Sequence, residues 1–144
     1  MQDDSGTAVD GIRFEDCPPP VADFIAMRAA CGWGELSPGL AGAALDGSLL
    51  AITAYDAHGR IAGILRAIGD PLYLYIQDAI IAPELRGSGL GTRMMQRLLS
   101  RIDADFPDAH VMLMCAKGRE RFYSELGFEA RPSRDFGPGM QRLR

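Results

Sequence analysis

The chain has 144 residues, of which 47% are hydrophobic and 24% charged, with a net charge of −4. This size and composition predict a globular domain with its own core, and the acidic balance excludes a typical nucleic-acid binder while favouring cationic partners. No apolar run approaches the ~20 residues of a membrane span, so a membrane partner is not expected.

Residues 1–10 have no basic start and no apolar core, so they predict a flexible lead-in rather than a signal peptide, and a cytoplasmic protein. One domain is expected over residues 11–144. After a run of three prolines, Val21, Phe24, Ile25 and Arg28 follow helical spacing, and glycines end this helix at Gly32 and Gly34.

A second helix is predicted from Pro38 to about Leu45, with Ser37 as its cap. Three apolar runs separated by turn residues then predict an antiparallel meander of strands over residues 49–55, 60–68 and 72–81. Strict alternation in the third strand places Leu74, Ile76 and Asp78 on one face, and Tyr73, Tyr75 and Gln77 on the other.

A glycine-rich turn follows the third strand and opens an amphipathic helix. The first amides of a helix lack internal partners, and glycines let a ligand approach them, so residues 86–91 (Arg-Gly-Ser-Gly-Leu-Gly) predict a phosphate cradle. A P-loop is excluded because no lysine precedes Thr92, and Thr92 also replaces the third glycine of a dinucleotide fingerprint.

The next helix has one apolar face, made by Leu90, Met94, Met95, Leu98, Leu99 and Ile102. The continuous apolar run at residues 111–115 predicts a strand covered on both faces, parallel to the strand at 72–81 through a helical crossover. A short helix over 118–126 and two strands at 128–131 and 140–143 complete the predicted order, two helices, three strands, then helix, strand, helix and two strands.

The cysteines and histidines indicate no metal or redox centre. Cys17, Cys31 and Cys115 have no metal-like spacing, so reduced thiols are expected, with Cys115 in the core. Two histidines, His58 and His110, are too few for a multi-histidine site, and no metal is expected.

Two motifs carry a resemblance to a known family. Residues 86–91 fit Arg/Gln-x-x-Gly-x-Gly/Ala, and residues 123–128 fit Tyr-x-x-x-Gly-Phe, about 30 residues later. In this order and spacing they resemble the GNAT superfamily of acetyl-CoA-dependent N-acetyltransferases. The resemblance implies an α/β (α+β) fold with a mixed, mostly antiparallel central sheet, flanking helices and a splayed parallel strand pair. A homodimer is a habit of that family.

The resemblance also implies where acetyl-CoA, the co-substrate, would bind. Backbone of Ala79, Ile80 and Ile81 would contact the pantetheine and acetyl groups. The diphosphate would be held by Arg86, Gly87, Ser88, Gly89, Leu90, Gly91 and Thr92. The acceptor cleft would form from the loop at Trp33–Glu35, the strand at 72–81 and the loop at 136–140, where Glu35, Asp78 and Asp135 would favour a cationic amine.

The resemblance places Tyr123 where a phenol often protonates the departing thiolate, with packing against Phe122 as the alternative. Asp78 is the only acid of its strand, and we expect it to position or deprotonate the amine. The alternatives are a carboxylate that fixes a strand bulge by bonding backbone amides, and a chain of water molecules with no dedicated base.

The function expected from these features is acetyl transfer from acetyl-CoA to a primary amine of a small molecule, by direct attack in a ternary complex. Protein lysines or N-termini are the rival acceptors. A non-catalytic acyl-CoA-binding regulatory module, or a phosphate-binding protein of another fold, are the alternatives from other classes.

Overall fold

The computed structural model describes residues 11–144, so the lead-in predicted at residues 1–10 lies outside the described part. The chain divides into two compact units, Met1–Leu113 and Met114–Arg144, which are described separately. That residues 11–144 act as one domain stays a prediction.

The first unit is built on a five-stranded sheet whose strands follow the chain order β1-β2-β3-β4-β5. Neighbouring strands from β1 to β4 pair in antiparallel fashion, whereas β4 and β5 pair in parallel. The predicted mixed, mostly antiparallel sheet is therefore confirmed. The strands are β1 (Arg13–Glu15), β2 (Leu50–Tyr55), β3 (Ile61–Gly69), β4 (Tyr73–Ile81) and β5 (His110–Leu113).

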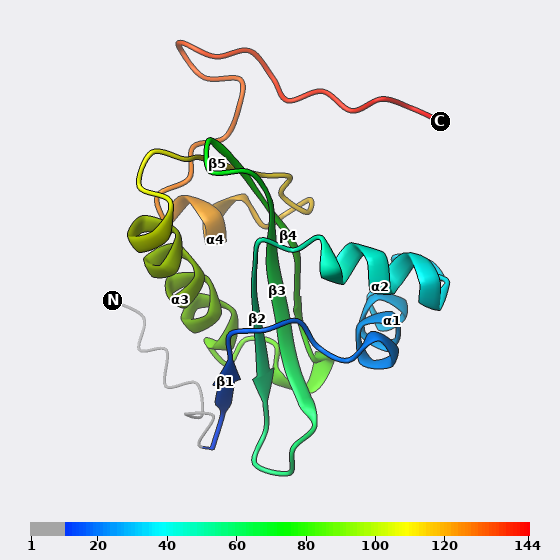
Figure 1. Cartoon of the computed structure of the whole chain (residues 1–144). Helices are drawn as coiled ribbons and strands as arrows, with labels where there is room; N and C mark the ends of the chain where they lie inside the picture. Colours follow the sequence, from blue (N-terminus) through cyan, green and yellow to red (C-terminus); the bar gives the residue numbers. More distant parts are fainter. Residues whose placement is uncertain (1–10) are drawn as a thin grey trace. The chain divides into compact units, whose positions relative to one another are not determined.

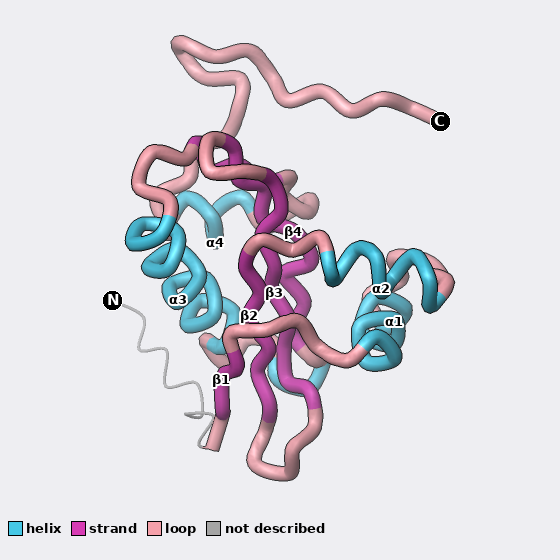
Figure 2. Tube along the Cα trace, viewed as in Figure 1, coloured by secondary structure: helices cyan, strands magenta, loops and turns pink. Residues whose placement is uncertain are grey.

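Helices cover both faces of this sheet (Figures 1 and 2). On one face lie α1 (Val21–Ala30) and α2 (Pro38–Asp46), where Phe24 and Leu45 form a buried cluster with Ile64 and Ile80 of the strands. Ser37 caps α2 as predicted, because its side chain accepts a hydrogen bond from the Leu40 amide at 3.2 Å.

The opposite face carries α3 (Leu90–Asp105), which connects β4 to β5. Its predicted apolar face is confirmed, since Leu90, Met94, Met95, Leu98 and Ile102 are buried. The helix approaches the sheet closely at Gly63, where an added Cβ would lie 2.7 Å from the Met94 sulfur. A side chain at position 63 would therefore force Met94 to shift.

Two elements of the first unit were not predicted from the sequence. They are the three-residue strand β1 and a 3₁₀ turn, η1 (Pro83–Leu85), between β4 and the glycine-rich loop. The prediction that the fifth strand is covered on both faces is wrong, because His110 and Met112, which share one face of β5, are exposed, Met112 by 38%.

The second unit contains one short helix, α4 (Glu120–Ser124), within the predicted range of 118–126. The strands predicted at 128–131 and 140–143 are absent, and both segments are irregular. A strand needs a hydrogen-bonded neighbour, and no strand of the described chain pairs with either segment. Cys115 is exposed rather than in the core, because it follows the end of β5.

Candidate active site

Strand β4 carries a bulge at Asp78. The pairing register runs from Ile64↔Ile80 to Arg66↔Gln77, so Leu65 of β3 faces two residues of β4, Asp78 and Ala79. Asp78 has φ of 54°, the left-handed region, and is the only non-glycine residue among 11–144 with positive φ. Such backbone strain occurs often at functional sites.

The bulge changes which face Asp78 occupies. Gln77 lies opposite Arg66 in the antiparallel pair, and the Asp78 carboxylate also binds Arg66. Asp78 therefore shares a face with Gln77, because the extra residue interrupts the alternation. The prediction that Asp78 lies on the face of Leu74 and Ile76 is wrong.

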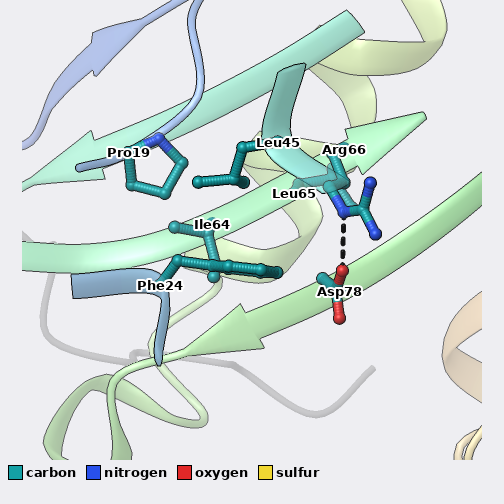
Figure 3. A pocket seen from close by; sticks show the side chains of 7 residues that line it. All are labelled: Pro19, Phe24, Leu45, Ile64, Leu65, Arg66 and Asp78. Carbon is teal, nitrogen blue, oxygen red and sulfur yellow. Dashed lines mark hydrogen bonds and ion pairs between the residues drawn. The ribbon is translucent and has the colours of Figure 1, made fainter. Parts of the chain in front are cut away.

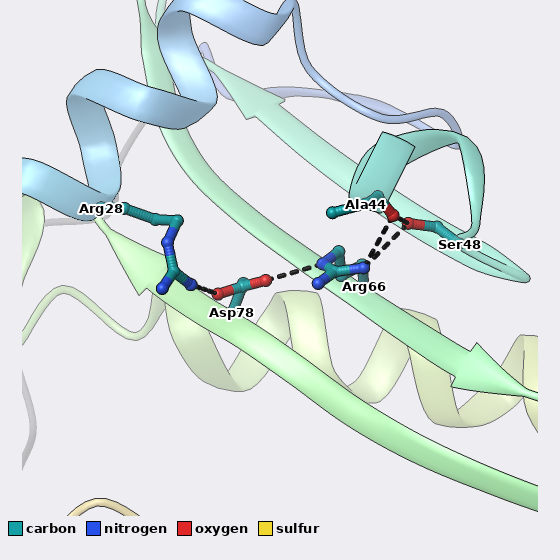
Figure 4. Close-up of polar contacts among 5 residues, drawn as sticks. All are labelled: Arg28, Ala44, Ser48, Arg66 and Asp78. Carbon is teal, nitrogen blue, oxygen red and sulfur yellow. Dashed lines mark hydrogen bonds and ion pairs between the residues drawn. The ribbon is translucent and has the colours of Figure 1, made fainter. Parts of the chain in front are cut away.

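The Asp78 carboxylate is held between two arginines (Figure 4). One oxygen accepts from Nη1 of Arg28, in the last turn of α1, and the other accepts from Nε of Arg66 at 2.6 Å. Arg66 also donates through Nη1 to the Ala44 carbonyl at 2.9 Å and lies 3.5 Å from Ser48 Oγ. This ionic network links α1, α2, β3 and β4.

The network leaves the Asp78 side chain only 2% exposed, with both carboxylate oxygens occupied. These contacts are those of a residue that fixes the bulge and docks α1. The predicted alternative of a carboxylate bonded to backbone amides is not what holds it; side chains do. A direct part of Asp78 in catalysis stays a prediction.

A small cavity lies beside Asp78 (Figure 3). Its volume of about 10 Å³ suits a single water molecule, so it is too small to be a substrate site. Its wall is apolar except at Arg66 and Asp78, and consists of Pro19, Phe24, Leu45, Ile64, Leu65, Arg66 and Asp78.

Strand β4 runs beyond its parallel neighbour. The pairing with β5 covers Tyr73 to Ile76 and ends there, while β4 continues to Ile81. Residues 77–81 therefore have no β5 partner in the register. Ala79 is exposed, and this outer edge is where the sequence predicts the pantetheine and acetyl contacts of Ala79, Ile80 and Ile81.

The glycine-rich loop connects η1 to α3 in a conformation that depends on two glycines. Gly87 and Gly89 have φ of 77° and 83°, values that L side chains rarely adopt. Gly89 is the residue before α3, and no side chain caps the helix there. The N-terminal amides of α3 therefore depend on solvent or a ligand for acceptors.

The amides of this loop divide into two groups. Those of Arg86 and Ser88 donate to the Pro83 and Leu85 carbonyls, at 3.4 and 3.3 Å, and the Leu90 amide lies 3.4 Å from Ser88 Oγ. Among residues 11–144 no acceptor is found for the other four, which belong to Gly87, Gly89, Gly91 and Thr92. These four amides are free to donate to a negatively charged ligand.

Arg86 is exposed, and its guanidinium donates to Cys31 Sγ at 3.6 Å, at the end of α1. Its predicted contact with the diphosphate stays a prediction. Arg86 and the bulge at Asp78 both contact the C-terminal part of α1, so this helix joins the glycine-rich loop and β4 within the first unit.

Tyr123 belongs to the second unit, on α4, where it is half-buried. Its ring makes edge contacts with Phe122 and Phe128, at centroid distances of 5.0 and 6.0 Å. Burial raises the pKa of the Tyr123 phenol, the nearby Cys115 thiol adds to the rise, and Arg119 opposes it. The phenol therefore holds its proton throughout the neutral range.

The sequence matches one family model over residues 41–140, described as an acetyltransferase (GNAT) domain. The chain belongs to the GNAT acetyltransferase family. This match covers the bulged strand, the glycine-rich loop, α3 and Tyr123, and confirms the resemblance expected from the two motifs.

Solved structures share the GNAT fold. A protein of unknown function from meticillin-resistant Staphylococcus aureus has a TM-score of 0.80 at 22% identity, covering 92% of this chain and 99% of its own. A GNAT-family acetyltransferase from Streptococcus pneumoniae has 0.76 at 25% identity, covering 92% and 98%. Glucosamine-6-phosphate N-acetyltransferase from Arabidopsis thaliana has 0.70 at 14%, covering 94% and 98%. No curated protein is significantly similar in sequence.

Sequence reasoning about this GNAT domain missed Arg28 and Arg66. The signal for Arg28 was present, because an arginine occupied an otherwise apolar helical face with Val21, Phe24 and Ile25. A charge on such a face requires a partner. The partner, Asp78, could not be predicted from the sequence, because it is 50 residues away on a strand whose bulge changes the face on which its side chain lies.

No group of three or more His, Cys, Asp or Glu side chains within residues 11–144 could hold a metal ion. No helix in the same range combines the length and apolar character needed to span a bilayer.

Proposed function

We propose that this protein transfers the acetyl group of acetyl-CoA to a primary amine of a small molecule. The observation that carries the proposal is the set of four unpartnered amides at Gly87, Gly89, Gly91 and Thr92, at the uncapped start of α3. Each amide bond to a phosphate oxygen would contribute about 1.5–3 kcal/mol.

The residues present fit acetyl-CoA in two further ways. Glycines leave positions 87 and 89 without side chains, and a Cβ at either would meet nothing within 4 Å, so the backbone there is open to a ligand. The edge of β4 beyond Ile76 offers backbone groups with no β5 partner, which suits the amide-containing pantetheine. Arg86 would add a positive charge beside the diphosphate.

Acetyl-CoA supplies a thioester carbonyl that a neutral amine can attack. Backbone amides at the β4 bulge would stabilise the negative charge that develops on the carbonyl oxygen. As the C–N bond forms and the C–S bond breaks, Tyr123 would donate its phenolic proton to the leaving sulfur. The amine would lose its proton to water, since both oxygens of Asp78 accept from arginines.

The pairing of Asp78 also favours a second candidate, an acyl-CoA-binding module without turnover, because β4 then lacks an available carboxylate base. Calorimetry with acetyl-CoA and a thiol-release assay with a panel of primary amines separate the two. We expect saturable acetyl-CoA binding and amine-dependent thiol release. Tight binding with release no faster than background hydrolysis would favour the module, and no binding would reject both.

A further inference from the structure

Arg28 has hydrogen-bonding capacity that the fold does not use. A guanidinium has five N–H donors, and Arg28 donates through Nη1 to Asp78. Its Nε is buried without an acceptor, and among residues 11–144 no acceptor is found for Nη2. In Figure 4 one terminal nitrogen of Arg28 points at Asp78 and the other points away from it.

The unused donors form one edge of the guanidinium. Nε and Nη2 lie side by side and direct parallel N–H bonds, the arrangement that binds a carboxylate or phosphate through two oxygens. Nε is fully buried, whereas the side chain as a whole is 22% exposed, so Nη2 is the unused donor that solvent reaches.

The charge around this edge is positive. Arg28 and Arg66 share one carboxylate, Asp78, which leaves one net positive charge. Arg66 also donates to the Ala44 carbonyl and lies near Ser48 Oγ. Within the described chain, no ion pair joins Arg28 to Glu35. Asp78 therefore adds no net negative charge that would favour a cationic amine, contrary to the expectation from the sequence.

Trp33 covers the guanidinium. Its ring centroid lies 5.5 Å from Arg28 Cζ, its amide donates to the Arg28 carbonyl at 3.1 Å, and the residue is 44% exposed. Because this ring lies against the guanidinium, we expect it to move when a ligand reaches the buried Nε. Trp33 is the single tryptophan of the chain, so its fluorescence reports on Arg28 directly.

We propose that the Nε–Nη2 edge of Arg28 binds an anionic oxygen group, a carboxylate or a phosphate, carried by the acceptor amine. This inference rests on the proposed function, because Arg28 is tied to Asp78, next to Ala79 at the edge assigned to the acetyl group. The diphosphate of acetyl-CoA has its own acceptor-free amides, those of Gly87, Gly89, Gly91 and Thr92. The acceptor is therefore an amine that also carries a negative charge.

The test is a fluorescence titration of Trp33, with CoA present, using pairs of amines that differ by one anionic group. Phenylalanine against phenethylamine tests the carboxylate, and phosphoethanolamine against ethanolamine tests the phosphate. We expect a saturable change with the anionic member of one pair, at an affinity about 10- to 100-fold above that of the amine that lacks the anionic group. Equal responses within both pairs, or none, would overturn the proposal.

Arg28→Lys keeps the charge and the partner of Asp78 but removes the two-donor edge. We expect this variant to lose the preference for the anionic member while its affinity for acetyl-CoA stays unchanged. Arg60→Gln is the control, because Arg60 lies in the exposed β2–β3 turn and pairs with Asp56. A preference that survives in Arg28→Lys, or a loss of acetyl-CoA affinity instead, would overturn the proposal.

Thiol release with the same amines separates this inference from the proposed function. Anion-dependent binding through Arg28 without any acetyl transfer would support the anion site and reject the transferase. Transfer to the anionic amines with the same KM in wild type and Arg28→Lys would reject the anion site and leave the transferase standing.

Discussion

Arg28 and Asp78, 50 residues apart in the sequence, form an ion pair that joins the last turn of α1 to the bulge of β4. The pair lies where the strand has its left-handed residue and where pairing with β5 has already ended. The ion pair between Arg28 and Asp78 thus fixes the backbone that precedes Ala79–Ile81. In this account Asp78 positions the site, and the glycine-rich loop binds the co-substrate.

Replacing Asp78 should destabilise the first unit strongly. Asp78→Asn leaves two largely buried guanidinium groups without their carboxylate, and we expect a loss of about 3–5 kcal/mol in the free energy of unfolding, measured in urea. Asp103→Asn, at an exposed position on α3, is the control and should change it by less than about 0.5 kcal/mol.

The same variant decides whether Asp78 is a base. If Asp78→Asn keeps wild-type stability and acetyl-CoA affinity but recovers its turnover only at high pH, Asp78 deprotonates the amine and the positioning role is wrong. We expect the stability loss to dominate instead.

The regular elements of this fold could be predicted because local signals determine them. Ser37 and Pro38 define the start of α2, and the apolar face of α3 follows helical spacing from Leu90 to Ile102. The family could be predicted for a similar reason, since each of its two motifs is a continuous stretch of the sequence.

The rest depends on contacts between distant residues. The bulge at Asp78 arises from a register shift against β3, which no local pattern of β4 reveals. Arg13–Glu15 is too short to give a strand signal, and its pairing with β2 defines it as one. Residues 128–131 are irregular because no strand of the described chain pairs with them, and a single Phe among Glu, Ala and Arg is a weak strand signal.

The loop conformation should depend on glycine at position 89. Alanine there must adopt a φ near +83°, which costs about 1–2 kcal/mol, although its Cβ would meet no neighbour within 4 Å. We expect Gly89→Ala to bind acetyl-CoA about tenfold more weakly by calorimetry, because the amides at the start of α3 would shift.

Gly39→Ala provides the matched control for that variant. Gly39 lies in the first turn of α2 with ordinary φ and open space around its Cβ position. This change should stabilise the fold by up to about 1 kcal/mol and leave acetyl-CoA affinity unchanged. Equal affinity in both variants would show that the left-handed glycine is not needed for binding.

Tyr123→Phe should lower kcat by about 100-fold, as expected for loss of a general acid, with the KM for acetyl-CoA unchanged. Because burial raises the pKa of Tyr123, the wild-type rate should fall only above the ordinary phenol range, near ~10. The rate profile of the variant should lack that alkaline fall. Identical rates for both proteins at every pH would reject the acid role.

Acid should weaken the contact between the segment after β1 and α3. A hydrogen bond from Arg97 lowers the pKa of Asp16, burial opposes this, and Arg101 adds to the lowering. The ion pair therefore stabilises the fold above the ordinary aspartate pKa, near ~3.9, and this stability is lost as pH falls through the lowered value.

Asp16 is 38% exposed, so the effect is small. We expect Asp16→Asn to cost under about 1 kcal/mol at pH 7 in urea unfolding. The difference from wild type should shrink below the ordinary pKa. A difference that stays constant down to pH 2 would show that packing, rather than charge, links Asp16 to α3.

The most direct test of the central claim is an amide NMR titration of the whole chain with acetyl-CoA. We predict saturable shifts at the backbone N–H groups of Gly87, Gly89, Gly91 and Thr92, and smaller ones at Arg86 and Ser88, whose amides already donate within the loop. No binding, or binding that leaves those four amides unshifted, would contradict the account.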